Sequence, residues 1–160
     1  MADSSCLVFN HLSVASAFSF KYGTAQPRDL VERAAQFGAP ALAITDRDSL
    51  AGVIRFVQAC KDFGIAPIVG INLALADSRV TLLAQSNGGS NGGWRSLCRL
   101  MSALRSDRNL PILDLEKIKN LSEYTSNLIL LHGPESEIAQ LISKQRQDQA
   151  LQVFNRYRPY

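Results

Sequence analysis

The 160-residue sequence lacks the features that mark membrane, secreted or disordered proteins. No apolar run comes near the roughly 18 residues that a membrane span needs, and the first residues show no basic and then apolar segment typical of a secretory signal. Charged residues make up only 19% and hydrophobic residues 46%, which is typical of a globular chain rather than a disordered or coiled-coil one. We therefore expect one globular, cytoplasmic domain.

Cysteine is scarce, and the net charge is small. The three cysteines, Cys6, Cys60 and Cys98, are widely spaced and form no CxxC pair, which favours reduced thiols over disulfides or a zinc knuckle. Seventeen basic against 14 acidic residues give a net charge of +3. This balance is compatible with a nucleic-acid neighbour but argues against an autonomous DNA-binding protein.

Common catalytic motifs are missing as well, since the sequence has no Walker loop, GxGxxG, GxSxG or HExxH. The residual candidates for a metal site are two aspartates after an apolar run and the two histidines: Asp46, Asp48, His11 and His132. Helix capping is the more common role for such aspartates, and solvent exposure for the intervening Arg47. Two distant histidines do not by themselves define a metal centre.

Apolar periodicity predicts strands that alternate with helices. Short runs typical of strands lie at 7–9, 12–14, 41–45, 67–70, 73–75, 80–84 and 128–131. Amphipathic helices are expected over 27–37, 50–63, 94–104 and 114–119 and through most of 135–157. In the second helix the predicted apolar face consists of Leu50, Val53, Ile54, Val57 and Cys60. The Gly/Ser/Asn-rich residues 86–93 predict a flexible loop inside a single domain.

This alternation favours right-handed βαβ units and a mainly parallel sheet, which is an α/β fold. Such folds place their binding and catalytic groups at the carboxyl ends of the strands. The segments expected there are 46–49, 70–72, 85–87 and 132–133. A closed (β/α) barrel takes about 250 residues, so a barrel of that type would be incomplete in this chain.

Several blocks of sequence follow one another in a distinctive order: 11–20 (HLSVASAFSF) with 22–25 (YGTA), 30–35 (LVERAA), 41–46 (ALAITD) with 49–53, 64–70, 82–84 (LLA) and 94–102. Together they resemble the PHP (polymerase and histidinol phosphatase) domain, in the version that begins the alpha subunit of bacterial DNA polymerase III and of its error-prone relatives. The resemblance covers nearly the whole chain and implies a PHP-type (β/α) barrel, incomplete in 160 residues. Within the first block, Ser16, Ser19 and Gly23 are expected to shape a turn.

In active members of this family, histidines and carboxylates at strand ends hold two or three divalent metals that activate water for phosphoester hydrolysis. The resemblance places four of these ligands at positions that carry other residues here: Ser13, Ala15, Arg47 and Asn72. Of these motifs only Asp46 survives. Serine and alanine offer no imidazole nitrogen, and Arg47 adds a fixed positive charge, so the resemblance implies no bound metal and no catalytic residue.

The resemblance thus favours a non-catalytic structural platform of a DNA polymerase, used in replication or in error-prone repair synthesis. The implied partners are the remainder of the alpha subunit and replisome or repair proteins, with DNA reached through the parent protein and no membrane. In the family, the polymerase carboxylates for nucleotidyl transfer lie beyond residue 160, so this chain alone is not expected to synthesise DNA.

Two alternatives remain open. The first is an active Zn- or Mn-dependent phosphoesterase or 3'-5' exonuclease that recruits the four residual candidates Asp46, Asp48, His11 and His132. The second is a stand-alone module that binds nucleic acid, which the net charge of only +3 disfavours.

Overall fold

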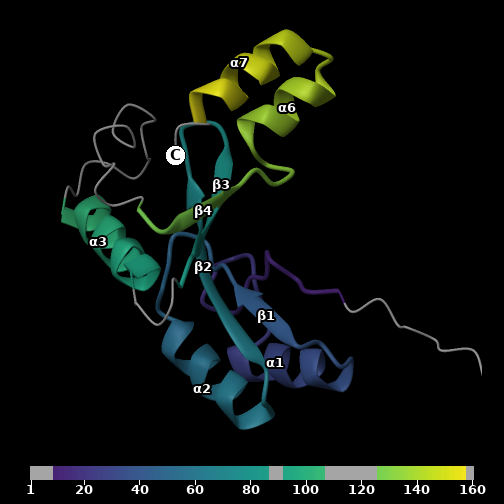
Figure 1. The fold of residues 1–160 in the computed structure, drawn as a ribbon, viewed down its shortest axis with the longest axis vertical. Coiled ribbons are helices and arrows are strands. Elements are labelled where there is room, and N and C mark those ends of the chain that lie inside the picture. Colours follow the sequence, from purple (N-terminus) through teal and green to yellow (C-terminus); the bar gives the residue numbers. More distant parts are fainter. Residues whose placement is uncertain (1–8, 87–91, 107–125, 158–160) are drawn as a thin grey trace, which may run out of the picture.

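A computed structural model describes residues 9–86, 92–106 and 126–157, and Figure 1 shows their helices arranged around a four-stranded sheet. The helices are α1 (Pro27–Gln36), α2 (Val53–Phe63), α3 (Gly92–Ser106), α6 (Glu137–Ser143) and α7 (Gln147–Tyr157). The strands are β1 (Ala41–Ile44), β2 (Ala66–Ala74), β3 (Arg79–Ala84) and β4 (Leu128–Leu131). The predicted α/β class is confirmed. Within the described ranges, none of the helices combines the length and apolar character needed to cross a membrane.

The long strand β2 joins two differently built halves of the sheet, whose order is β1-β2-β3-β4. Its first half pairs in parallel with β1, and its second half pairs antiparallel with β3, where Asn72 lies opposite Thr81. Strand β4 is antiparallel to β3. The prediction of a mainly parallel sheet was therefore wrong. A short turn closed by a hydrogen bond from Leu75 N to Ser78 O joins β2 to β3, where a parallel pair would need a crossover helix.

Two apolar clusters hold the helices to this sheet. One packs α1 and α2 against β1, with Val31, Ile44 and Phe56 almost fully buried. The other packs α3 against β2 and β3 around Ile71 and Leu97. In Figure 1 the helices α6 and α7 form a separate pair beside the turn that joins β2 and β3. The strand ends near the middle of the molecule are thus held by rigid elements from several parts of the chain.

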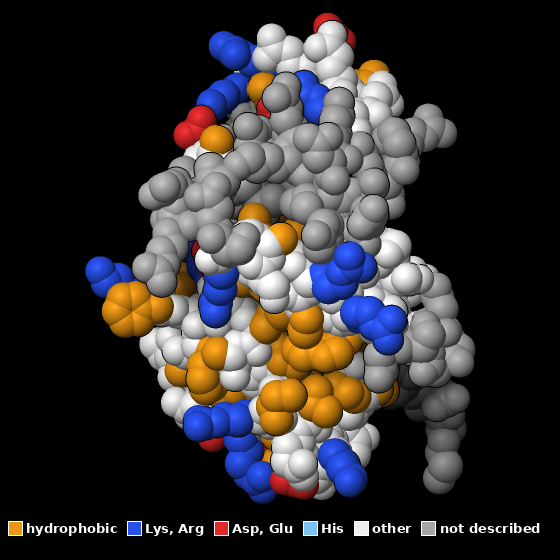
Figure 2. Space-filling view, turned by 90° about the vertical axis from the view of Figure 1, so that its left-hand side faces the viewer, with side chains coloured by type: hydrophobic (Ala, Val, Ile, Leu, Met, Phe, Trp, Pro, Cys, Tyr) orange, Lys and Arg blue, Asp and Glu red, His pale blue; other side chains and the backbone are white. Residues whose placement is uncertain are grey.

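Helix α2 ends where the sequence predicted, because Gly64 takes the left-handed conformation (φ 69°) that a C-cap requires. Its buried face was predicted wrongly. Ile54 is 71% exposed and Val57 is also exposed, whereas Phe56 and Ala59 are buried beside Val53 and Cys60. Positions 53, 56 and 60 fit helical spacing equally well, and the large Phe56 ring fills the space between α2 and the sheet. Figure 2, which views the side where α2 and α3 lie, shows apolar side chains gathered on the lower half of that face among Lys and Arg.

The strand predicted at 12–14 does not form. Ala43 N nevertheless donates to His11 O at 3.0 Å and Thr45 N to Val14 O at 2.8 Å, so the segment runs along the edge of β1. Residues 7–8, 87–91 and the predicted helix 114–119 lie outside the described residues. Helix α3 begins at Gly92, inside the range predicted as a loop.

The two described cysteines are free thiols, as predicted, while Cys6 lies outside the described residues. Cys60 is fully buried, and this burial raises the pKa of its thiol to about 11. Cys98 is partly buried, which also raises its pKa. Since the thiolate is the reactive form, these raised pKa values make both thiols less reactive at neutral pH.

Candidate functional site

A polar pocket of about 210 Å³ opens where the edge of β1, the middle of β2 and the start of β3 meet the loop after β4. Its lining includes all four positions at which the resemblance places substituted metal ligands: Ser13, Ala15, Arg47 and Asn72. These residues are up to 59 positions apart in sequence (72 − 13), so the fold alone brings them together.

The location of the pocket agrees with the prediction for strand ends. Three of the four segments singled out from the sequence contribute to it, through Arg47, Asn72 and Gly133. The fourth, 85–87, contributes nothing among its described residues 85–86. The reason is that β3 runs antiparallel to β2, so the carboxyl end of β3 lies at the opposite edge of the sheet.

Arg47 extends into the pocket and is held there by two contacts. Its Nη2 atom donates to both carboxylate oxygens of Glu135, at 2.7 and 2.9 Å. Its guanidinium carbon also lies 3.4 Å from the centroid of the Tyr22 ring. Only 25% of the Arg47 side chain is exposed, so the expectation of a solvated surface arginine was wrong. A fixed positive charge therefore lies at a position where the resemblance implies a substituted metal ligand.

A second guanidinium, that of Arg79, lies beside the first. Its Nη2 atom donates at 2.8 Å both to Asp48 Oδ2 and to the backbone oxygen of Asn72, while its Nε donates to Asn72 Oδ1. The same Nε lies 3.9 Å from Glu135 Oε2. We call Arg47, Arg79, Asp48, Asn72 and Glu135 the arginine cluster. It ties the turn after β1 and the start of β3 to the loop after β4.

Asp46 does not line the pocket and instead binds the turn that precedes α1. Its Oδ1 accepts hydrogen bonds from Ser16 N at 2.6 Å and Ser19 Oγ at 2.7 Å, and its Oδ2 accepts from Ser16 Oγ at 2.8 Å. The carboxylate is 1% exposed. The predicted capping role was wrong, because α2 has Gly52 as its N-cap and no side-chain cap. The two serines do shape a turn, as predicted.

Asp48 also does not cap α2. It adopts a left-handed backbone conformation (φ 53°), which turns its side chain toward β2 and β3. Its Oδ1 accepts from Ala74 N at 2.8 Å, and its Oδ2 accepts from Arg79. Both oxygens of this exposed side chain are therefore used to anchor the turn after β1 to neighbouring strands.

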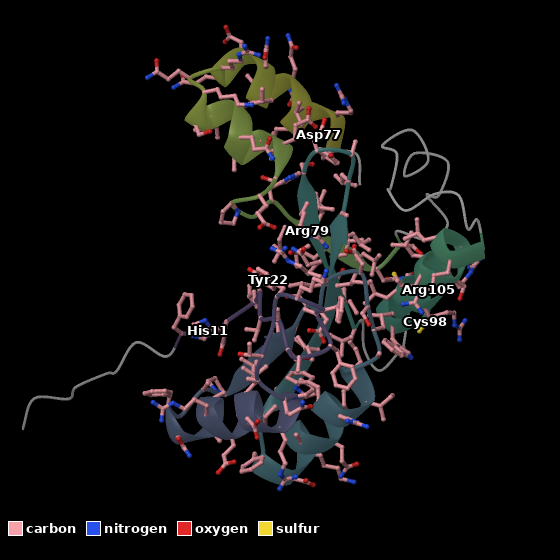
Figure 3. All side chains as sticks on the ribbon, turned by 180° about the vertical axis from the view of Figure 1, so that it is seen from behind. His11, Tyr22, Asp77, Arg79, Cys98 and Arg105 are labelled. Carbon is pink, nitrogen blue, oxygen red and sulfur yellow. The ribbon has the colours of Figure 1, made fainter. Side chains whose placement is uncertain are left out.

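The two histidines lie apart from the pocket. His11 is exposed, with its ring 4.8 Å from Phe9, and Figure 3 shows it well to one side of Tyr22 and Arg79. His132 follows β4 and packs edge-on against Tyr157, with 4.8 Å between ring centroids. Neither histidine lines the pocket, so the residual candidates do not converge.

The donor set of the pocket does not fit a divalent metal. Its acidic lining residue is Glu135, whose carboxylate already faces the guanidinium groups of Arg47 and Arg79. Within residues 9–86, 92–106 and 126–157, no group of three or more His, Cys, Asp or Glu is placed to hold a metal ion. Zinc and manganese sites need several imidazole or carboxylate ligands, and two cations beside one carboxylate disfavour a third cation.

Sequence reasoning missed Tyr22, Arg79 and Glu135. Arg79 carried a weak signal, since it directly follows the polar turn before an apolar strand. Glu135 lies 88 residues from its partner Arg47, and nothing local connects them.

A polar pocket at the strand ends of an α/β sheet is typical of domains whose binding sites are assembled from those ends. The chain belongs to the PHP domain family, whose model matches residues 11–160. The resemblance inferred from the sequence motifs is therefore confirmed.

Its relatives include long DNA polymerases. DNA polymerase III subunit alpha of Buchnera aphidicola is 34% identical over 84% of this chain and 12% of that protein. The error-prone DNA polymerase of Symbiobacterium thermophilum is 34% identical over 93% of this chain and 15% of that protein. The chain thus spans less than a sixth of either relative. Among solved structures, an amidohydrolase from Chromobacterium violaceum has a TM-score of 0.43 and 17% identity over 89% of this chain and 48% of that chain, too distant to bear on the site.

Replacing Glu135 by alanine should lower the stability of the domain modestly. The ion pair with Arg47 is partly exposed at 25% and 52% of the two side chains, and such pairs contribute up to about 1 kcal/mol. We expect a fall in Tm of about 2–4 °C in low salt, smaller in 1 M salt because ions screen the pair. Differential scanning calorimetry of Glu135→Ala beside Glu32→Ala, an exposed carboxylate on α1 outside the pocket, measures this. An equal loss in both variants would show that the arginine cluster adds nothing.

His132 should make stability fall on acidification. Burial lowers the pKa of its imidazole below the usual 6.5, with Glu137 acting in the opposite direction. In the unfolded chain the usual pKa returns, so below about pH 6.5 the unfolded state binds a proton that the folded state does not. Stability that is present above that pH is then lost as the pH falls. Between pH 7.5 and 5.5 we expect Tm to drop more in the unaltered chain than in His132→Gln. His11→Gln, at the exposed histidine, is the matched control variant.

Proposed function

We propose that this chain is one partial PHP domain that acts as a non-catalytic platform within a DNA-synthesising polypeptide, with the rest of a polymerase III alpha or error-prone polymerase as its partner. Three features support this proposal: membership of the PHP family, relatives that are DNA polymerases, and a pocket whose ligand positions are substituted. In this proposal the chain carries no polymerase palm, fingers or thumb, and the chemistry of DNA synthesis belongs to other segments of the parent protein.

The observation that carries the proposal is the position of Arg47. Its guanidinium is stacked on Tyr22 and paired with Glu135 inside the pocket. Arginine keeps its charge at every physiological pH, so it does not become a metal ligand by losing a proton. With Arg79 beside it, the pocket has two fixed positive charges where an active family member holds cations.

The arginine cluster gives the platform a mechanical role. It connects the turn after β1, the start of β3 and the loop after β4 by ion pairs and hydrogen bonds. Metal ions bound by several strand ends make the same kind of cross-link, and in this proposal the arginine cluster replaces them.

A phosphodiesterase assay tests the proposal. The purified chain is incubated with bis(p-nitrophenyl) phosphate in Mn²⁺, in Zn²⁺ and in EDTA, and we expect release of p-nitrophenol at the rate of the buffer in all three. We also expect the same Tm with and without EDTA. Hydrolysis that needs Mn²⁺ or Zn²⁺ and is lost in Glu135→Ala would contradict the proposal.

The alternative, an active phosphoesterase, has one observation in its favour. Glu135 supplies a carboxylate inside the pocket, and carboxylate oxygen is a ligand for zinc and manganese. To bind a metal, Glu135 would have to leave Arg47, to which it is hydrogen-bonded through both oxygens. The assay with Glu135→Ala distinguishes the two functions.

A further inference from the structure

The turn at residues 18–22 presents large aromatic rings to solvent beside the pocket. Phe20 is 85% exposed and Tyr22 is 58% exposed, and Tyr22 also lines the pocket. A single exposed aromatic ring is common on protein surfaces and needs no explanation. Here, however, two exposed rings lie in one short turn at the mouth of the pocket.

The turn is rigidly held, so the exposure of its rings is a fixed feature. Tyr22 N and Gly23 N both donate to Ser19 O at 3.0 Å, and the Ser19 hydroxyl is bound by buried Asp46. Any side chain at Gly23 would place its Cβ 2.0 Å from Ser16 O, so only glycine fits there. The chain fixes this turn with buried hydrogen bonds and yet leaves both rings in water.

Each ring has a cation beside it. Lys21 Nζ lies 5.6 Å from the Phe20 ring centroid, and Arg47 is stacked on Tyr22. Figure 3 shows Tyr22 near Arg79, the second cation of the pocket. The pocket lining holds two cations, Arg47 and Arg79, and one carboxylate, Glu135. Asp48 pairs with Arg79 from outside this lining, and Lys21 adds a third cation beside the Phe20 ring. The surface is both aromatic and positively charged.

From this juxtaposition we propose that the turn at 18–22 and the mouth of the pocket bind single-stranded nucleic acid. An unpaired base stacks on the Phe20 ring, and the adjoining phosphates lie near Lys21 and the guanidinium groups of Arg47 and Arg79. Alternating aromatic and cationic side chains are the usual means of binding single strands without sequence preference. The cations favour a polyanion over an apolar protein surface. This contact requires no metal and no hydrolysis, and it goes beyond the role of a structural platform.

The chain contains a natural control. Phe37, at the end of α1, is 72% exposed and has the guanidinium of Arg33 at 4.4 Å from its ring. It thus matches Phe20 as an exposed phenylalanine next to a cation, but it does not line the pocket and has no second ring in the same turn. Phe20→Ala and Phe37→Ala remove the same apolar area from two different places.

The experiment measures fluorescence anisotropy of a labelled oligo(dT) of about 12 nucleotides, within the range of known single-strand sites, in 50 mM salt with EDTA present. We expect saturable binding by the unaltered chain. Phe20→Ala should raise Kd by about fivefold or more, because stacking on a ring contributes about 1–3 kcal/mol per base. Phe37→Ala should leave Kd unchanged, and Phe20→Trp should restore binding. In Phe20→Trp, oligo(dT) should also quench the fluorescence of the new tryptophan at position 20. The unaltered chain has only Trp94 and should not show this quenching.

Other outcomes overturn the proposal. No binding of oligo(dT) by the unaltered chain at 0.1 mM protein contradicts it, as does equal weakening in Phe20→Ala and Phe37→Ala. If Phe20→Ala instead abolishes concentration-dependent self-association in sedimentation velocity, the ring serves a contact between copies of this chain. Because EDTA is present throughout, failure of oligo(dT) binding is distinguishable from failure of the non-catalytic platform, which rests on the metal and hydrolysis measurements.

Discussion

Asp46→Ala should be the most destabilising single substitution at the site, with a loss of about 3 kcal/mol. The carboxylate accepts three hydrogen bonds from Ser16 and Ser19 and is 1% exposed. Alanine would leave one backbone N–H and two hydroxyl groups without their acceptor in a place that water does not reach. For a domain of this size, the loss corresponds to a fall in Tm of roughly 6–12 °C. Thermal unfolding followed by circular dichroism measures it.

Asp62→Ala is the matched control for this prediction. Asp62 is also an aspartate with hydrogen-bonding partners, Arg28 and Gln58, but it lies on the surface. Its removal should change Tm far less than the removal of Asp46. In Asp46→Ala, hydrogen exchange should also speed up at the Ser16 amide. Equal Tm values for Asp46→Ala and Asp62→Ala would show that the buried carboxylate does not organise the turn.

Restoring the substituted ligands should create a metal site. The variant S13H/A15H/R47H/N72E places three imidazoles and one carboxylate at positions that all line one pocket. Such a set satisfies the tetrahedral preference of zinc, and the removal of Arg47 also removes a fixed positive charge and frees Glu135. We expect about one equivalent of Zn²⁺ after dialysis and a rise in Tm that EDTA reverses.

The contribution of Arg47 is isolated by a smaller variant. S13H/A15H keeps the guanidinium beside two new imidazoles, and its repulsion should hold zinc binding far below that of the fourfold variant. If the fourfold variant folds but binds no more zinc than the unaltered chain, the four positions do not face a common site. That result would refute the assignment of the pocket as a substituted PHP centre.

Local patterns predicted most of the elements but not how they pair. Pro27 in the first turn and Gly38 after the last turn predicted helix α1. The apolar runs predicted strands β1 and β4. The prediction of a mainly parallel sheet was wrong because β2 is joined directly to β3 by a turn, which makes the two strands antiparallel. The alternation of strands and helices does not reveal such a direct connection. The face of α2 was wrong because two sets of positions share helical spacing, and only the packing of Phe56 decides between them.

The site was predictable where motifs align in order and not where it depends on distant side chains. The resemblance placed Ser13, Ala15, Arg47 and Asn72, and the structure gathers all four in one pocket. Nothing in the sequence indicates that Glu135 pairs with Arg47, because the pairing depends on β4 lying antiparallel to β3. The sequence predicts Asp46 as a ligand or a cap, whereas its role in the turn follows only from the positions of the two serines.

Elemental analysis of the purified 160-residue chain, equilibrated with Zn²⁺ and Mn²⁺ and then dialysed, tests the role of the arginine cluster most directly. Because guanidinium groups lie at the strand ends, we expect only trace amounts of bound metal, and the same amounts in Glu135→Ala. One or more equivalents of zinc or manganese per chain, reduced in Glu135→Ala, would mean that the pocket binds cations despite Arg47 and Arg79 and would contradict the account.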